Sequence, residues 1–226
     1  MCFSATASYG TAAVLVATGL YAVRQAKRLP PPYWLWALVP AFFGFQQAFE
    51  GRVWQALDSG DANAAVFFAL GFHFFSHFLW LWWFPLCSAL VEPGKLRKRV
   101  FFGCAVFGAL AGTLVYSVML LHSEWLSVAL RGHSIHYNFS APWHSPIHLP
   151  VTAAMLYGLI ILLPLLFSSH MKIRIFGGLI ALSMALASEV FSAAYVSVWC
   201  FFAAVLSLYL VYMVRGVAAG SKPASI

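Results

Sequence analysis

A polar cluster lies inside a segment of the chain that otherwise has the composition of a membrane-spanning helix. Within residues 45–54, a helix would separate Gln46 from Glu50 by four residues and Gln47 from Glu50 by three. One carboxyl and two amide groups would therefore share one helix face. Because ionisable side chains at membrane depth are costly, they usually face a bundle interior, a cavity or a partner. Glu50 is thus a candidate functional residue, supported by Gln46 and Gln47.

Thiol and imidazole groups from other parts of the chain are predicted to reach the same level as Glu50. Cys200 lies about four residues inside the last apolar run and Glu50 about seven inside the second, so both fall within roughly 10 Å of one membrane face. Cys2, His133 and Glu189 approach this level from other segments. Zinc accepts thiolate, imidazole and carboxylate ligands, and soft thiolates also hold Cu(I). We predict a zinc or copper site made by Cys2, Glu50, His133 and Cys200, with Gln47 and Glu189 supporting these ligands.

His73 and His77 form a second candidate site, one helical turn apart and surrounded by aromatic residues. Their spacing aligns both imidazoles on one helix face, which suits binding of a metal or of the edge of a haem. Counting from Ala62 at about 1.5 Å per residue, His73 lies near the middle of the membrane, deeper than Glu50. The alternative is that each histidine only forms a hydrogen bond with a neighbouring helix. We group both with Gln46 as residues that bind a ligand or support the site.

The positions of these residues depend on a set of long apolar runs. Of the 226 residues, 62% are hydrophobic and 8% are charged, whereas about 25% are charged in an average soluble domain. Seven runs have lengths suited to crossing a bilayer: 7–23, 33–57, 62–91, 100–121, 149–167, 173–191 and 194–214. The sequence therefore predicts an all-α fold, a polytopic transmembrane bundle of about seven helices that forms one domain over residues 1–226.

Basic residues occur mainly in alternate connections between these runs. They follow the first, third, fifth and seventh runs: Arg24, Lys27, Arg28, Lys95, Arg97, Lys98, Arg99, Lys172, Arg174, Arg215 and Lys222. Because positive loops stay in the cytoplasm, we expect an outside N-terminus and a cytoplasmic C-terminus. The net charge of +7 then has a cause in topology, and we exclude nucleic-acid binding. The lipid bilayer is the expected partner, and the sequence leaves a homo-oligomer and an unidentified small ligand open.

The connection at residues 122–148 is the largest polar region and is expected outside the membrane. It contains five histidines: His122, His133, His136, His144 and His148. Within residues 132–139 the side chains alternate, with one side formed by His133, Ile135, Tyr137 and Phe139. Period-two alternation predicts a short strand or a hairpin. We expect this segment to fold over the helix ends as a lid.

Three further motifs accompany the N-terminal Met-Cys-Phe-Ser-Ala. They are Gln46-Gln47-x-x-Glu50-Gly51-x-x-Trp54, Gly132-His133-Ser134-Ile135-x-Tyr137 and Ser197-Val198-Trp199-Cys200-Phe201-Phe202-Ala203. With these motifs the whole chain resembles a family of uncharacterised bacterial multi-pass membrane proteins, the DUF6629-like proteins. The resemblance implies a location in the bacterial cytoplasmic (inner) membrane and marks positions, but it implies no chemistry. His73 and His77 lie outside the motifs.

Two alternatives use the same residues differently. In the first, Cys2 and Cys200 form a disulfide bond on the oxidising side, either as a structural link or as an active thiol/disulfide redox pair. In the second, Ser4, Glu50 and the paired histidines belong to a zinc-dependent intramembrane hydrolase, which would resemble the alkaline ceramidase-like superfamily. The last apolar run lacks the His-x-x-x-His pair that this superfamily carries. We predict a metal- or small-ligand-binding pocket near the outer membrane face, and the sequence leaves open whether the protein is an enzyme.

Overall fold

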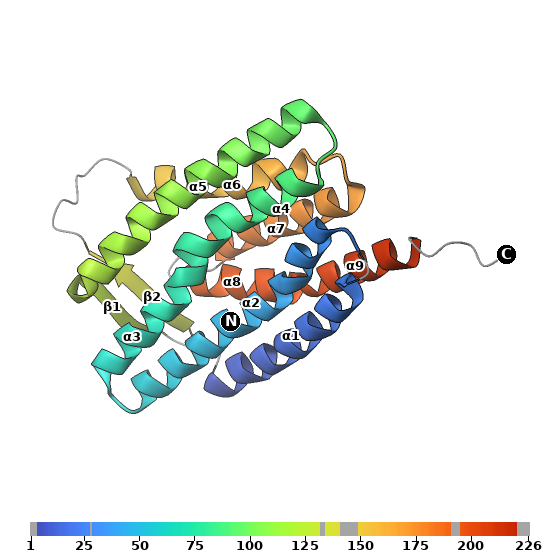
Figure 1. Ribbon diagram of the computed structural model, residues 1–226. Coiled ribbons are helices and arrows are strands. Elements are labelled where there is room, and N and C mark those ends of the chain that lie inside the picture. Colours follow the sequence, from blue (N-terminus) through green and yellow to red (C-terminus); the bar gives the residue numbers. More distant parts are fainter. Residues whose placement is uncertain (1–3, 28, 132–133, 141–148, 191–194, 221–226) are drawn as a thin grey trace.

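The computed structural model describes residues 4–27, 29–131, 134–140, 149–190 and 195–220, and it is mostly helical. The helices are α1 (Ala5–Ala26), α2 (Pro31–Asp58), α3 (Ala62–His73), η1 (Phe74–Leu79), α4 (Trp80–Val91), α5 (Lys95–Leu121), α6 (Leu149–Leu166), α7 (Met171–Val190), α8 (Tyr195–Leu206) and α9 (Leu208–Gly220). The segments α3, η1 and α4 form one continuous rod, and α8 and α9 form another, so the described helices make seven rods apart from the short 3-10 helix η2 (Ser123–Trp125) (Figure 1). The predicted bundle of about seven helices is confirmed.

Five of the rods are long and apolar enough to cross a membrane. Among the described residues these are Ala5–Ala26, Ala62–Val91, Lys95–Leu121, Met171–Glu189 and Tyr195–Val217. The rod α2 has sufficient length, but Gln46, Gln47 and Glu50 lower its hydropathy. Within α6, the described apolar helix Met155–Leu166 is shorter than the others. The chain is therefore a multi-pass membrane protein, and the long helix that carries Glu50 is not one of these five apolar rods.

Small residues bring α1 and α2 into close contact along their length (Figure 1). A Cβ atom added at Gly19 would lie within 3 Å of the Ala41 backbone, and one added at Gly51 would lie 2.8 Å from the Tyr9 ring. Close approach through small residues is a common basis of helix association in membranes. The pairing holds the Glu50 helix against the first helix of the chain.

The third rod contains a π-helical segment, η1, which the sequence did not predict. It begins directly after His73 and includes Ser76 and His77. A π-helical turn inserts an extra residue into the α-helical repeat and is frequent at functional sites. The insertion changes the direction in which the following side chains leave the helix. The relative orientation of His73, Ser76 and His77 is therefore set by η1.

Between α5 and α6, the chain forms an antiparallel hairpin of β1 (Leu126–Arg131) and β2 (Ser134–Phe139). Ile135 in β2 is fully buried, and it packs with Leu126 against side chains from α2, α3 and α5. The Tyr137 ring stacks on Phe72 with the ring centroids 5.2 Å apart. The predicted lid is confirmed for the described residues, and it reaches the level of His73. We call this end of the bundle, with the turn between α2 and α3, the hairpin end (Figure 1).

The opposite end of the bundle holds the connections between α1 and α2, α4 and α5, and α6 and α7 (Figure 1). We call it the basic end, because Lys27, Arg97 and Lys172 lie in or next to these connections. Its central feature is the Glu92 side chain, which is only 2% exposed. Glu92 accepts hydrogen bonds from the Ser169 N–H, at 2.8 Å, and from the Ser169 hydroxyl.

Further contacts strengthen the same junction. The Ser168 hydroxyl donates to Glu92 at 3.4 Å, and His170 Nε2 donates to the Val91 carbonyl at 2.8 Å. Burial by itself would raise the pKa of Glu92, but hydrogen bonds from Ser169 and Gly94 and the charge of Arg97 outweigh it, so the pKa lies below its usual value. The Glu92 carboxylate thus joins the α4–α5 and α6–α7 connections.

We expect Glu92→Gln to destabilise the protein by about 1–3 kcal/mol at pH 7, because one acceptor oxygen becomes a donor that faces Ser169. The measurement is thermal unfolding of detergent-purified protein over a pH series. The folded-state pKa of Glu92 is lowered. Its contribution to the free energy of unfolding is therefore present above the ordinary glutamate pKa and is lost as the pH falls below about 4. The difference in stability between wild type and Glu92→Gln should therefore become smaller at low pH. The exposed Asp58→Asn serves as control, and equal stability of Glu92→Gln and wild type at pH 7 would contradict this role.

Candidate functional site

Glu50 is the centre of a buried polar cluster between α2 and α8. Its side chain is 0% exposed. The Ser197 hydroxyl of α8 donates a hydrogen bond to one carboxyl oxygen at 2.5 Å, and Gln47 Nε2 donates to the other at 3.1 Å. Buried polar groups need such partners, because an unpaired one loses its hydration without compensation. The hydrogen bond from Ser197 therefore fixes the position of α8 relative to α2.

Gln46 extends this cluster to α4, and Cys200 adds a thiol to it. The Trp80 indole N–H donates to the Gln46 carbonyl oxygen at 2.9 Å. The buried Cys200 thiol lies close enough to interact with both Glu50 and Gln46. The sequence correctly predicted that Glu50, its two amide neighbours and Cys200 lie at one depth in the bundle. The structure shows that they also face one another.

The sequence analysis missed Ser197, although this residue begins one of the quoted motifs. Ser197 and Cys200 lie three residues apart in α8, a spacing that puts both on one helix face. This spacing was an available signal. The sequence contained no signal for the partner of the Ser197 hydroxyl, because Glu50 lies 147 residues away in the chain.

His73 and His77 form a second polar cluster, with Ser76 between them. The two Nδ1 atoms are 3.1 Å apart, and the Ser76 hydroxyl lies 2.9 Å from His77 Nδ1. One Nδ1 must carry a proton and the other must accept it, since two bare nitrogens would repel at this distance. These bonds lie within one rod, rather than joining separate helices as the alternative interpretation expected. Above them, the Tyr137 ring lies 4.7 Å from the His73 ring.

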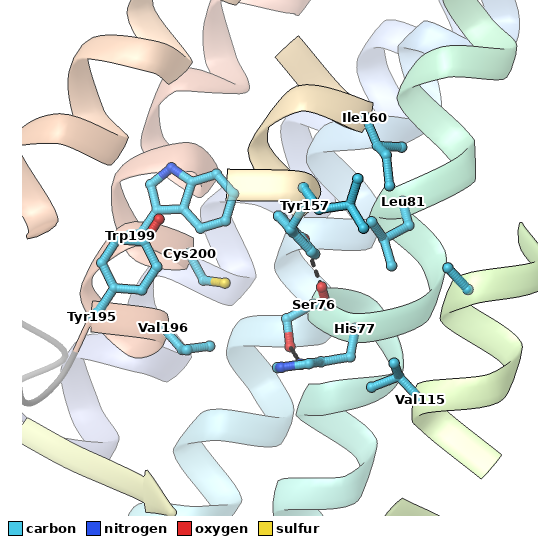
Figure 2. Close-up of a pocket in the computed structure, with 12 residues that line it drawn as sticks. Ser76, His77, Leu81, Val115, Tyr157, Ile160, Tyr195, Val196, Trp199 and Cys200 are labelled. Carbon is cyan, nitrogen blue, oxygen red and sulfur yellow. Dashed lines mark hydrogen bonds between the residues drawn. The ribbon is translucent and has the colours of Figure 1, made fainter. Parts of the chain in front are cut away.

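A cavity of about 390 Å³ lies beside the two clusters. Residues from η1, α4, α5, α6 and α8 line it: Ser76, His77, Leu81, Ala111, Val115, Leu156, Tyr157, Ile160, Tyr195, Val196, Trp199 and Cys200. Figure 2 shows Trp199 and Cys200 on one side of the space and Ser76 and His77 on the other. The Tyr157 hydroxyl donates to the Ser76 carbonyl at 2.6 Å. The cavity is in the size range of small-molecule sites and is mainly apolar.

The other predicted site residues are not assembled in the described ranges. Cys2 and His133 lie outside the described residues, and so do His144 and His148. Glu189 is exposed near the end of α7, and no contact between it and Glu50 occurs in the part of the chain that the structure describes. Ser4, used by the hydrolase alternative, caps α1 by accepting a hydrogen bond from the Ala7 N–H at 3.2 Å.

The predicted metal site therefore stays a prediction. Across the described residues, no group of three or more His, Cys, Asp and Glu side chains is arranged to hold a metal ion. Glu50 and Cys200 would supply two of the four predicted ligands, and the other two belong to residues that the structure does not describe. Among the described residues, Cys87, Cys104 and Cys200 form no disulfide bond with one another. The predicted disulfide between Cys2 and Cys200 also stays untested.

The helices and the two buried clusters define a multi-pass membrane protein with a cavity next to intramembrane polar groups. Residues 1–224 match the model of DUF6629, a family of unknown function, and the chain belongs to this family. The resemblance inferred from the motifs is confirmed. Comparison with curated proteins and with solved structures finds no match.

We expect Ser197→Ala to destabilise the protein by about 1–2 kcal/mol, because Glu50 loses a hydrogen bond that a buried carboxyl group cannot replace with water. Thermal unfolding in detergent measures the effect. The control is Ser188→Ala, since the Ser188 hydroxyl is exposed and donates to Ala185 in its own helix. If the two variants unfold at the same temperature as wild type, Ser197 does not stabilise the Glu50 cluster.

Proposed function

We propose that this protein binds a small, mainly apolar molecule in the cavity between η1, α4, α5, α6 and α8. The observation that carries the proposal is the uneven lining of this cavity. Ser76 and His77 contribute polar atoms from one side and Cys200 from the other, while the remaining wall is largely aliphatic and aromatic. A ligand with one polar group would hydrogen-bond with these side chains and bury the rest of its surface against the apolar wall.

Both clusters have capacity left for a ligand. His77 uses Nδ1 toward Ser76 and His73, and among the described contacts its Nε2 has no hydrogen-bond partner. The Cys200 sulfur points toward the cavity in Figure 2. An imidazole nitrogen and a thiol can each donate or accept a hydrogen bond. The site therefore suits a neutral hydroxyl or carbonyl group better than it suits a strongly charged one.

We place the cavity on the outer side of the membrane. The described basic residues near the connections gather at the basic end: Arg24, Lys27, Lys95, Arg97, Lys98, Arg99, Lys172 and Arg174. By the positive-inside rule this end faces the cytoplasm, and the hairpin end faces outward. The Glu50 and His73 clusters lie toward the hairpin end, as the contact of Tyr137 with His73 indicates. Location in a bacterial cytoplasmic membrane remains the prediction made from the sequence.

A zinc or copper site is a second candidate, favoured by the proximity of the Glu50 carboxyl and the Cys200 thiol. We expect near-stoichiometric metal in purified protein, and a loss of metal in Glu50→Gln and in Cys200→Ser. Elemental mass spectrometry measures the content, with the exposed Glu124→Gln as control. Intact mass gives the second readout. A protein without metal that lacks two protons at Cys2 and Cys200 would support the disulfide alternative instead.

For the proposed ligand, we expect wild-type protein to retain an organic molecule through purification. Ala111→Trp should remove it, because the new indole would fill the cavity from α5. Leu110→Trp is the matched control, since Leu110 is the neighbouring residue and is 67% exposed on the lipid-facing side. Solvent extraction followed by mass spectrometry identifies what each protein carries. The same molecules at the same level in wild type and Ala111→Trp would contradict binding in this cavity.

A further inference from the structure

A second apolar groove lies along α5 and α6, on the side of the cavity away from α2. It has a volume of about 300 Å³, and its lining includes Val100 and Phe107 from α5 and Leu159 and Leu163 from α6. The groove and the cavity have Leu156 and Ile160 in common. The two spaces therefore adjoin each other between α5 and α6, with the Leu156 and Ile160 side chains at their boundary.

The groove opens toward the surroundings of the bundle. Leu159 is 58% exposed, Phe107 is 50% exposed and Leu156 is 44% exposed. Phe107 lies in a segment that is long and apolar enough to cross the membrane, and Leu156 and Leu159 lie in the apolar helix Met155–Leu166. In a membrane these side chains meet hydrocarbon chains. A molecule that enters the cavity through this groove would therefore come from the bilayer.

Where α5 faces α4 and η1, close helix contacts leave little space. A Cβ atom added at Gly108 would collide with the Leu81 backbone, and one added at Gly112 would lie 3.1 Å from the His77 carbonyl oxygen. These two glycines hold α5 against α4 and η1, so this side offers no comparable passage. At Gly103, which lines the groove, an added Cβ meets nothing within 4 Å. The space between α5 and α6 is thus the open approach.

The shape and polarity of the two adjoining spaces indicate their occupant. From Val100 in the groove to Val115 in the cavity, α5 rises by about 22 Å, most of the about 30 Å hydrocarbon core. The polar atoms of Ser76, His77 and Cys200 lie only at the cavity end. No Lys or Arg lines either space among the described residues. An elongated molecule with a neutral polar group at one end would fit this arrangement.

We propose that the ligand is a neutral long-chain amphiphile of the bilayer, which enters between α5 and α6 and binds with its hydrocarbon chain in the groove and its hydroxyl or carbonyl group beside His77 and Cys200. This inference rests on the proposed function and adds the ligand class and the route. Selection against anionic lipids follows from the lack of a cationic side chain in the lining and from the nearby Glu50 carboxyl.

The test uses the full chain in phosphatidylcholine vesicles with a photoactivatable long-chain alcohol as probe, and the matching long-chain carboxylate as comparison. After irradiation, mass spectrometry locates and quantifies labelled residues. We expect the alcohol to label α5 and α6 at least tenfold more than the carboxylate. Gly103→Trp, which blocks the groove, should reduce this labelling at least tenfold, and Leu110→Trp should leave it unchanged.

The outcomes of this experiment distinguish ligand binding in the cavity from entry of the ligand between α5 and α6. Labelling of the cavity that Gly103→Trp does not reduce would overturn the route between α5 and α6 and leave the cavity as a ligand site. Equal labelling by alcohol and carboxylate would overturn the neutral head group. Labelling that Ala111→Trp fails to reduce would overturn binding in the cavity itself. Val100→Trp is the second groove-blocking variant, and it replaces Gly103→Trp if that protein does not fold.

Discussion

The hydrogen bonds to the Glu50 carboxyl group constrain the arrangement of the helices around it. A carboxyl group inside a membrane protein is costly unless donors replace its hydration, and here Ser197 and Gln47 supply two. Because Ser197 belongs to α8, this bond fixes the relative depth and rotation of α2 and α8. Trp80 adds α4 through Gln46. With these contacts made, Cys200 lies beside Glu50 and at the wall of the cavity.

The cavity exists because α5 lies closer to α4 and η1 than it does to α6. Gly108 and Gly112 allow α5 to approach α4 and η1 closely, whereas α5 and α6 leave apolar space between them. The π-helical segment η1 then directs Ser76 and His77 to the cavity wall. Protein interiors are normally close-packed, so an opening next to two polar clusters is consistent with ligand binding.

The two ends of the bundle are stabilised in different ways. At the hairpin end, Ile135 and Tyr137 cover helix ends with apolar and aromatic contacts. At the basic end, Glu92 joins two connections through hydrogen bonds from Ser168 and Ser169. At the hairpin end the contacts are apolar and aromatic, and at the basic end a carboxylate lies near the cationic Arg97. The difference matches the charge asymmetry of the sequence.

The sequence by itself determined the bundle of about seven helices, the hairpin, and the face shared by Gln46, Gln47 and Glu50, because hydropathy and residue periodicity are local properties. It also predicted that Glu50 and Cys200 lie at the same depth in the membrane. Only the tertiary structure decided that Ser197 pairs with Glu50, that η1 interrupts the α-helical repeat, and that a cavity lies beside Cys200. Depth counted along a helix does not give the rotation about its axis, which is why Glu189 was predicted near Glu50 and is instead exposed. Rotation depends on contacts between residues far apart in the chain.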